Sequence, residues 1–379
     1  MEKLRFGMIG GGEGSFIGDV HRRGAELDDL AVLTAGCFSR TDDKNRKTAQ
    51  NWHIDETRLY SDFEDMAKRE SARKDGIDFV VIATPNNTHF PIAKCFLEQG
   101  IHVSCDKPVA MKTEEAEILR DLAAQKNLRF GVSYTYVNYP MVHQMRAMIE
   151  DGKIGHILTV MAEYPQDWVI RAAHNGEHPE RTWRFDSNAS GVSASTADIG
   201  THLECLIHHG TGLVVKKVLA NLTPIPAYMP LETNTQVLCQ LSGGIPASIW
   251  ASQVAFGHEC SVSLRVFGDK GALEWCHDNP NRLKYTPADE PEQYLTPARS
   301  FIVDDVRHMS RIVAGHPEGF FEAFATYYHA FCLDILHSRG LSNRASYAYP
   351  AIEDGIRGLQ FVDACIQSNQ SQNSWVSLR

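Results

Sequence analysis

The stretch Leu4-Arg-Phe-Gly-Met-Ile-Gly-Gly-Gly-Glu-Gly-Ser-Phe-Ile-Gly18 decides the fold of the N-terminal part of this 379-residue chain. Residues 4–9 form a short apolar run typical of a buried strand, and a helical pattern begins at Ile17. The glycines between them allow a sharp turn and let the backbone approach a pyrophosphate at the helix N-terminus. The strict G-x-G-x-x-G spacing is not met, because Ser15 occupies the third glycine position. The stretch therefore predicts a dinucleotide-binding turn with a longer loop than usual.

Strand-like and helical segments alternate on either side of this turn as far as residue 135. The expected strands are at residues 31–38, 79–83, 102–104 and 130–133, and the expected helices are at 17–27, 62–69, 91–99 and 113–126. Thr113 is expected to cap the last of these helices, with Glu114 and Glu115 in the first turn. Such alternation predicts βαβ units and a doubly wound parallel sheet that is covered on both faces.

The pattern changes to sequential strands after residue 140. A helix at 141–150 precedes expected strands at residues 157–164, 217–222, 235–241, 247–255, 261–267 and 271–275, and helices at 320–336 and 351–367 follow them. Short turn signals such as Ser242-Gly243-Gly244 join several strands. We predict an α/β chain with an NAD(P)-binding Rossmann domain at 1–135 and an α+β domain at 136–379. The second domain is expected to hold a large, mostly antiparallel open sheet, and its final helix can pack back on the first domain.

Composition and charge exclude several classes of protein. The net charge of −10 argues against a nucleic-acid or anionic-membrane partner, because a phosphate backbone requires a basic surface. The N-terminus has no apolar signal-peptide core, and no stretch approaches the ~20 apolar residues of a membrane span. The nine cysteines are scattered without a C-x-x-C pair, which indicates thiols in a reducing cytoplasm. We expect a cytoplasmic protein without a metal site.

The end of the second expected strand bears on which nicotinamide cofactor binds. Ser39 and Arg40 would suit a ribose 2′-phosphate, whereas Asp42 or Asp43 would bond a free 2′-hydroxyl. The sequence leaves NAD and NADP open, with a slight preference for NADP.

Three further stretches combine residues that suit chemistry. Thr84-Pro85-Asn86, with His89 shortly after, follows the third strand, and Asp106-Lys107-Pro108 follows the fourth. In a doubly wound sheet the carboxyl ends of the strands line the ligand crevice. The third stretch runs from Asp198 to His202, and in a helix these two side chains share one face.

Together these motifs resemble the glucose-fructose oxidoreductase / inositol dehydrogenase family, often called Gfo/Idh/MocA, over essentially the whole chain. The resemblance also includes Asp354-Gly355 near the end of the sequence. The family triplet is more often Glu-Lys-Pro, so Asp106 is a conservative departure. The long glycine loop resembles a subgroup that includes dehydrogenases of anhydrosugars and glycosides, which favours a cyclic sugar over an open chain.

The resemblance implies an NAD(P)-dependent dehydrogenase or reductase acting on a secondary hydroxyl of a cyclic polyol, sugar or glycoside. It implies that His202 is the base, that Asp198 orients the substrate or the histidine, and that Lys107 polarises the reacting oxygen. An imidazole suits proton transfer near neutral pH, and an ammonium stabilises a developing alkoxide. The expected cofactor-binding residues are Gly10, Gly12, Glu13, Gly14, Ser15, Phe16, Ile17, Ser39, Arg40, Thr84, Pro85, Asn86, His89, Asp106 and Lys107.

The substrate side is expected to combine polar groups with flat aromatic rings, which suit the hydroxyls and the C–H face of a sugar. The candidates are Tyr136, Gln166, Trp168 and Arg184. An open sheet with one uncovered face, together with the family resemblance, predicts a homodimer or homotetramer. Two alternatives stay open: a cofactor-retaining sugar-modifying enzyme, and a non-catalytic NAD(P)-binding sensor. The complete set of Lys107, Asp198 and His202 favours catalysis over the sensor.

Overall fold

The computed structural model describes residues 3–342 and 347–378. The chain divides into two compact units, which we call unit 1 (Met1–Thr135 with Gly319–Ile356) and unit 2 (Tyr136–Glu318 with Arg357–Arg379). The first division after residue 135 coincides with the expected domain boundary. Residues 319–356, which the sequence assigned to the second domain, instead belong to unit 1.

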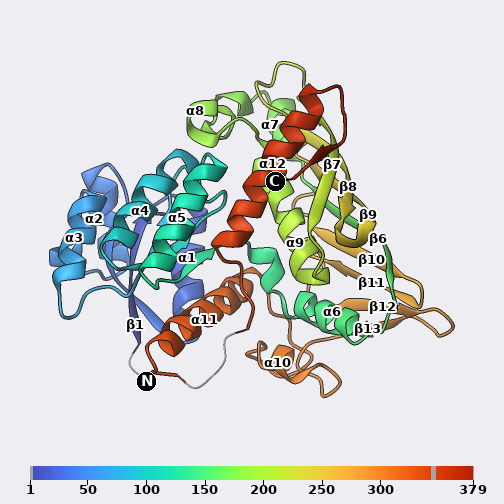
Figure 1. The fold of residues 1–379 in the computed structure, drawn as a ribbon. Helices are drawn as coiled ribbons and strands as arrows, with labels where there is room; N and C mark the ends of the chain where they lie inside the picture. Colours follow the sequence, from blue (N-terminus) through green and yellow to red (C-terminus); the bar gives the residue numbers. More distant parts are fainter. Residues whose placement is uncertain (1–2, 343–346, 379) are drawn as a thin grey trace. The chain divides into compact units, whose positions relative to one another are not determined.

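Unit 1 is built on a parallel sheet of five strands (Figure 1). The strands are β1 (Leu4–Gly10), β2 (Ala31–Cys37), β3 (Phe79–Ala83), β4 (His102–Cys105) and β5 (Phe130–Val132), in the order β2-β1-β3-β4-β5. Because β2 and β3 lie on opposite sides of β1, the chain changes direction across the sheet next to the loop that follows β1. Such a switch point is where doubly wound sheets bind ligands. The predicted Rossmann fold class is confirmed.

The helices of unit 1 mostly match the expected pattern. They are α1 (Phe16–Glu26), α2 (Asp42–Asn51), α3 (Phe63–Ala72), α4 (His89–Glu98), α5 (Thr113–Gln125) and α11 (Phe320–Ser338), with short 3-10 turns at Glu56–Arg58 and Asn86–Thr88. The expectation that Thr113 caps α5 was wrong. Thr113 is the first helical residue, and the Glu115 carboxylate accepts the Met111 amide at 3.1 Å, which fixes the helix start one residue earlier.

An aromatic layer explains why residues 319–356 belong to unit 1. The ring of Phe79 on β3 lies 5.2 Å from Phe6 on β1 and 5.4 Å from Phe331 on α11. α11 also packs closely on α1, where a side chain at Gly24 would come within 2.7 Å of the Phe324 Cβ. These side chains are fully or almost fully buried, so α11 supplies one side of the core of unit 1.

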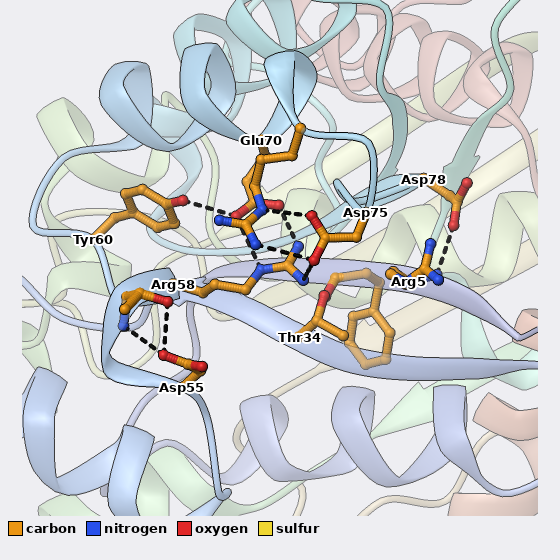
Figure 2. A network of polar contacts seen from close by, with 11 residues as sticks. Arg5, Thr34, Asp55, Arg58, Tyr60, Glu70, Asp75 and Asp78 are labelled. Carbon is orange, nitrogen blue, oxygen red and sulfur yellow. Dashed lines mark hydrogen bonds and ion pairs between the residues drawn. The ribbon is translucent and has the colours of Figure 1, made fainter.

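A buried ion pair joins the 3-10 turn Glu56–Arg58, which follows α2, to α3 (Figure 2). The guanidinium of Arg58 donates to both carboxylate oxygens of Glu70, and Tyr60 donates to Glu70 Oε1 at 2.8 Å. The side chain of Glu70 is completely buried and that of Arg58 is 8% exposed. The three residues fix the position of α3.

Unit 2 contains a sheet of nine strands, which confirms the predicted open, mostly antiparallel sheet (Figure 1). Its strands are β6 (Ile157–Pro165), β7 (Val215–Thr223), β8 (Asn234–Leu241), β9 (Pro246–Ser252), β10 (Ser263–Gly268), β11 (Gly271–Cys276), β12 (Leu283–Pro287), β13 (Gln293–Leu295) and β14 (Val376–Ser377), in the order β13-β12-β11-β10-β6-β9-β8-β7-β14. β6 and β9 pair in parallel, and the other pairs are antiparallel.

Helices cover one face of this sheet. The α-helices of unit 2 are α6 (Pro140–Glu150), α7 (Trp168–His174), α8 (Ser187–Ser190), α9 (Thr201–Thr211) and α10 (Asp304–Arg307), and α12 (Ile352–Gln370) belongs to unit 2 from Arg357 onward. α6 and α9 pack against each other and against β6, β10, β11 and β12. β8 alternates buried and exposed residues, as a strand with one solvated face does. A search of the described residues finds no helix long and apolar enough to cross a membrane.

Candidate active site

The glycine turn of unit 1 has the backbone that its sequence predicts. Gly10, Gly11 and Gly14 have positive φ values of 76°, 68° and 85°, which glycine adopts without strain. A Cβ at Gly18 would lie 1.8 Å from the Gly11 carbonyl oxygen, so the first turn of α1 touches the loop backbone. Gly18 thus fills the close-packing role of the third glycine, which explains why Ser15 can replace glycine. The Ser15 hydroxyl caps α1 by accepting the Gly18 amide at 3.3 Å.

The glycine loop is contacted by α2, a helix that the sequence analysis did not predict. The Gly12 amide donates to the Phe38 carbonyl at 3.2 Å, and the Glu13 amide donates to the Thr48 hydroxyl at 2.9 Å. The Glu13 carboxylate forms an ion pair with Lys47. The start of α1 remains accessible, since Phe16 is 72% exposed and Ile17 is half-buried.

Both sets of candidate ribose-binding groups lie in the segment that follows β2. Ser39 lies after the strand with its hydroxyl 3.2 Å from that of Thr41, and Arg40 is exposed. Asp42 and Asp43 begin α2 and are also exposed. Both alternatives weighed from the sequence therefore lie at this edge.

His89 links the loops after β3 and β4. Its ring is fully buried, with Nδ1 2.7 Å from the Pro108 carbonyl oxygen and Nε2 2.8 Å from that of Thr84. Burial lowers the pKa of this imidazole. His89 thus connects the Thr84-Pro85-Asn86 turn to the segment that carries Lys107.

The carboxylate of Asp106 lies in a buried network that the sequence did not reveal. Asp106 Oδ1 is 3.0 Å from Nε2 of His21 and accepts the Ser133 hydroxyl, and His21 Nδ1 is 2.5 Å from the Tyr328 hydroxyl. Burial alone would raise the pKa of Asp106, but the His21 ring and the hydrogen bonds from His21 and Ser133 lower it to about 2. The carboxylate therefore stays charged beside Lys107, which is half-buried.

Asp198 and His202 lie on one continuous helical segment of unit 2. A π turn at Thr196–Gly200 leads into α9, and its bond runs from the Thr201 amide to the Thr196 carbonyl. Single π turns occur frequently at functional sites. Asp198 is half-buried and its Oδ2 accepts the Gln253 amide at 3.3 Å, while His202 is 7% exposed.

Two tyrosine rings lie against the ring of His202, and a cysteine contacts the hydroxyls of both tyrosines. The Tyr136 ring lies 4.9 Å and the Tyr164 ring 6.1 Å from it, measured between centroids. The two tyrosine hydroxyls are 2.5 Å apart, and each is 3.1 Å from Cys260 Sγ. Gln166 donates to the Tyr164 hydroxyl at 3.3 Å. Of the expected substrate-side residues, Tyr136 therefore lies against His202, and Gln166 contacts Tyr164.

The remaining substrate candidates, Trp168 and Arg184, contact other aromatic residues of unit 2. Trp168 begins α7 and its ring is 5.9 Å from that of Phe185 in a small separate apolar cluster. Arg184 is exposed, with its guanidinium 4.9 Å from the Trp183 ring. Lys107 belongs to unit 1 and the other two expected catalytic residues belong to unit 2.

Comparison with known proteins gives matches along most of the chain. Residues 4–134 match the oxidoreductase family with an NAD-binding Rossmann fold, and residues 142–274 match the GFO/IDH/MocA C-terminal domain. The oxidoreductase YfiI of Bacillus subtilis is 33% identical over 385 residues, covering 99% of this chain and 97% of YfiI.

Solved structures and a further relative are also similar to this chain. An inositol dehydrogenase homolog from Azotobacter vinelandii, solved with NAD+, is 33% identical with a TM-score of 0.93 and covers 99% of this chain and 97% of its own. Its complex with NADH and myo-inositol superposes with a TM-score of 0.90. The levoglucosan dehydrogenase of Pseudarthrobacter phenanthrenivorans is 26% identical over 230 residues, 55% of this chain and 57% of that protein.

Proposed function

Because this chain belongs to the GFO/IDH/MocA family of NAD-dependent oxidoreductases, as its motifs predicted, we propose that it transfers a hydride between nicotinamide and a secondary hydroxyl of a cyclic polyol, sugar or glycoside. The observation that carries the proposal is the environment of His202. A buried imidazole, two tyrosine hydroxyls and the Gln166 amide gather there, which suits a ring substrate with several hydroxyls.

The glycine loop fits a dinucleotide. Gly10 has a Cβ position only 2.3 Å from the Ala83 carbonyl oxygen, and α1 begins immediately after the loop. Backbone amides and the positive end of α1 therefore face the place where a pyrophosphate binds in this fold. The residues from Gly10 to Ile17, with the loop held by His89, would hold the cofactor, which when bound supplies the hydride acceptor or donor. We further propose that Arg40 and Ser39 favour NADP over NAD.

Lys107, Asp198 and His202 are the proposed catalytic residues. His202 takes the hydroxyl proton during oxidation and returns it during reduction. The Lys107 ammonium stabilises the negative charge that develops on the reacting oxygen. Asp198, held by Gln253, orients the substrate. Tyr136, Gln166, Trp168 and Arg184 are the proposed substrate contacts.

The uncovered face of the nine-stranded sheet supports assembly into a homodimer or homotetramer. Leu238 is 53% exposed there, and Leu219, Gln236, Leu238 and Trp250 line a groove of about 410 Å³. An apolar groove on an open sheet is a common subunit interface. Light scattering of the purified protein checks this proposal: a monomeric mass at micromolar concentration would refute it. We also propose that the protein is cytoplasmic.

A spectrophotometric screen tests the proposed function. Purified protein is mixed with NAD or NADP and with inositols, aldoses, anhydrosugars or glycosides, and reduced nicotinamide is followed by its absorbance. We expect one class of ring substrate to be oxidised, with kcat lowered about 100-fold or more in Lys107→Ala and in His202→Ala. Failure of every pair despite cofactor binding would reject hydride transfer to added nicotinamide.

A further inference from the structure

Glu232 is a buried carboxylate in the loop between β7 and β8, and one of its oxygens accepts four hydrogen bonds. Glu232 Oε1 lies 2.6 Å from the Ser193 hydroxyl and 3.0 Å from the Ala194 amide nitrogen. It also lies 3.0 Å from the amide nitrogen and 2.9 Å from the hydroxyl of Thr196. The residue is 7% exposed. Segment 193–196 is therefore fastened to a single charged atom.

The charge of Glu232 is balanced by dipoles and not by a cation. Within residues 3–342 and 347–378, no lysine, arginine or histidine forms an ion pair with it. Its partners are two hydroxyls and two amides at the start of the helical segment that begins at Thr196. A carboxylate is stabilised at a helix N-terminus, and hydrogen bonds to a charged acceptor are roughly twice as strong as neutral ones.

Neighbouring residues extend this attachment toward Asp198. The Thr235 hydroxyl is 2.8 Å from that of Ser195 and 2.9 Å from that of Thr196. The Gln253 side chain donates to Asp198, and the Gln253 amide donates to the Thr233 carbonyl at 2.8 Å. We call Glu232, Thr235 and Gln253 the Glu232 frame.

The helical segment that the frame holds carries two of the proposed catalytic residues. Asp198 lies inside the π turn, and His202 lies in the first turn of α9. A π turn contains one residue more than the corresponding α turn, and one residue in a helix corresponds to a rotation of about 100°. If the π turn relaxed to α geometry, residues before it would rotate relative to His202.

We propose that Glu232 is a positioning residue, which fixes the start of this helix and its π turn so that Asp198 and His202 face the same substrate. The inference rests on the proposed function, because it assigns these two residues to catalysis. It predicts that loss of the Glu232 charge lowers kcat more than it changes the KM for nicotinamide, since unit 1 carries the cofactor loop.

The test compares Glu232→Gln with Glu70→Gln. Both variants replace a buried carboxylate by an isosteric amide, but Glu70 pairs with Arg58 in unit 1 and lies outside the proposed machinery. Steady-state kinetics use the substrate found in the screen, and amide hydrogen–deuterium exchange is measured over residues 190–205. We expect Glu232→Gln to lower kcat about tenfold and to speed exchange in residues 193–202. Glu70→Gln should keep kcat within about twofold and leave exchange in that segment unchanged.

The outcomes separate the two proposals. If the wild-type protein turns over its substrate and Glu232→Gln retains the wild-type kcat, the positioning role is refuted and the proposed function stands. If no substrate is found, the proposed function fails, and exchange still decides whether Glu232 holds the helix start: unchanged exchange refutes that role and faster local exchange supports it. Should Glu232→Gln not fold, Thr235→Val takes its place, with an expected kcat loss of about threefold and the same local exchange.

Discussion

Two buried glutamates, one in each unit, are stabilised by different kinds of hydrogen-bond partner. Glu70 in unit 1 faces the guanidinium of Arg58 and the hydroxyl of Tyr60, so its partners are all side chains (Figure 2). Glu232 in unit 2 faces two backbone amides and two hydroxyls of a single short segment. An ion pair between side chains joins two elements but leaves their backbone conformation free. A carboxylate that accepts backbone amides fixes the conformation itself, and this is the kind placed beside the proposed catalytic helix.

The largest effect on stability is expected at the ion pair. Glu70→Ala removes the closer counter-ion of the buried Arg58 guanidinium and leaves only Asp75 at 3.9 Å, which should lower the free energy of unfolding by about 3 kcal/mol. The double variant Arg58→Met with Glu70→Leu removes both charges and should recover most of this loss. Urea denaturation of the three proteins measures the difference. If the double variant is as unstable as Glu70→Ala, pairing with a single cation is not what distinguishes Glu70 from Glu232. No matching double variant exists for Glu232, because its backbone donors cannot be removed by substitution.

Asp106 is an intermediate case, since it accepts from an imidazole and a hydroxyl. Its pKa of about 2 lies below the ordinary value of 3.8, so its contribution to stability is complete above pH 4 and is lost as the pH falls toward 2. Asp106→Asn should therefore be less stable than wild type by about 2 kcal/mol at pH 6. The gap should shrink between pH 4 and pH 2 in denaturation curves. A gap that is constant with pH would mean that the carboxylate charge is not what His21 and Ser133 stabilise.

The smallest effect on stability is expected from the neutral partner in the Glu232 frame. Thr235→Val keeps the side-chain shape but removes the hydroxyl between Ser195 and Thr196. Because those hydroxyls are neutral and Thr196 retains Glu232, we expect a loss of about 1 kcal/mol in the free energy of unfolding. Thermal denaturation measures it against Thr233→Val, which removes a nearby buried hydroxyl that bonds to Ile225 instead. If Thr235→Val lowers the free energy of unfolding as much as Glu70→Ala does, the hydroxyls of the Glu232 frame, and not the Glu232 charge, supply most of its stabilising effect.

Sequence alone predicted the features that depend on local order. The glycine turn, the alternating strands of unit 1 and the helical spacing of Asp198 and His202 are encoded within a few residues, and the fold class and family that they indicated are confirmed. α2 was missed because its buried face includes the polar residues Asn45 and Thr48, which gives no apolar period. The strands β12 and β13 were missed because few of their residues are fully buried.

The rest of the candidate site depends on contacts between residues far apart in the chain. His21 reaches Asp106 across 85 positions and Tyr328 across 307, and Glu232 reaches segment 193–196 across up to 39. No spacing rule links such pairs, because the sheet order and the placement of α11 bring them together. The π turn at Thr196–Gly200 likewise follows no sequence pattern, and its first residue bonds to a carboxylate from another loop.

The composition of unit 1 has a consequence for how the protein is made. Residues 1–135 emerge from the ribosome early. The helix α11 packs on the aromatic surface of Phe6 and Phe79, but it emerges only after residues 136–318. During that interval the nascent N-terminal segment presents an apolar sheet surface with nothing to cover it, and such surfaces promote aggregation. This surface is therefore expected to be covered only once α11 (Phe320–Ser338) has been translated.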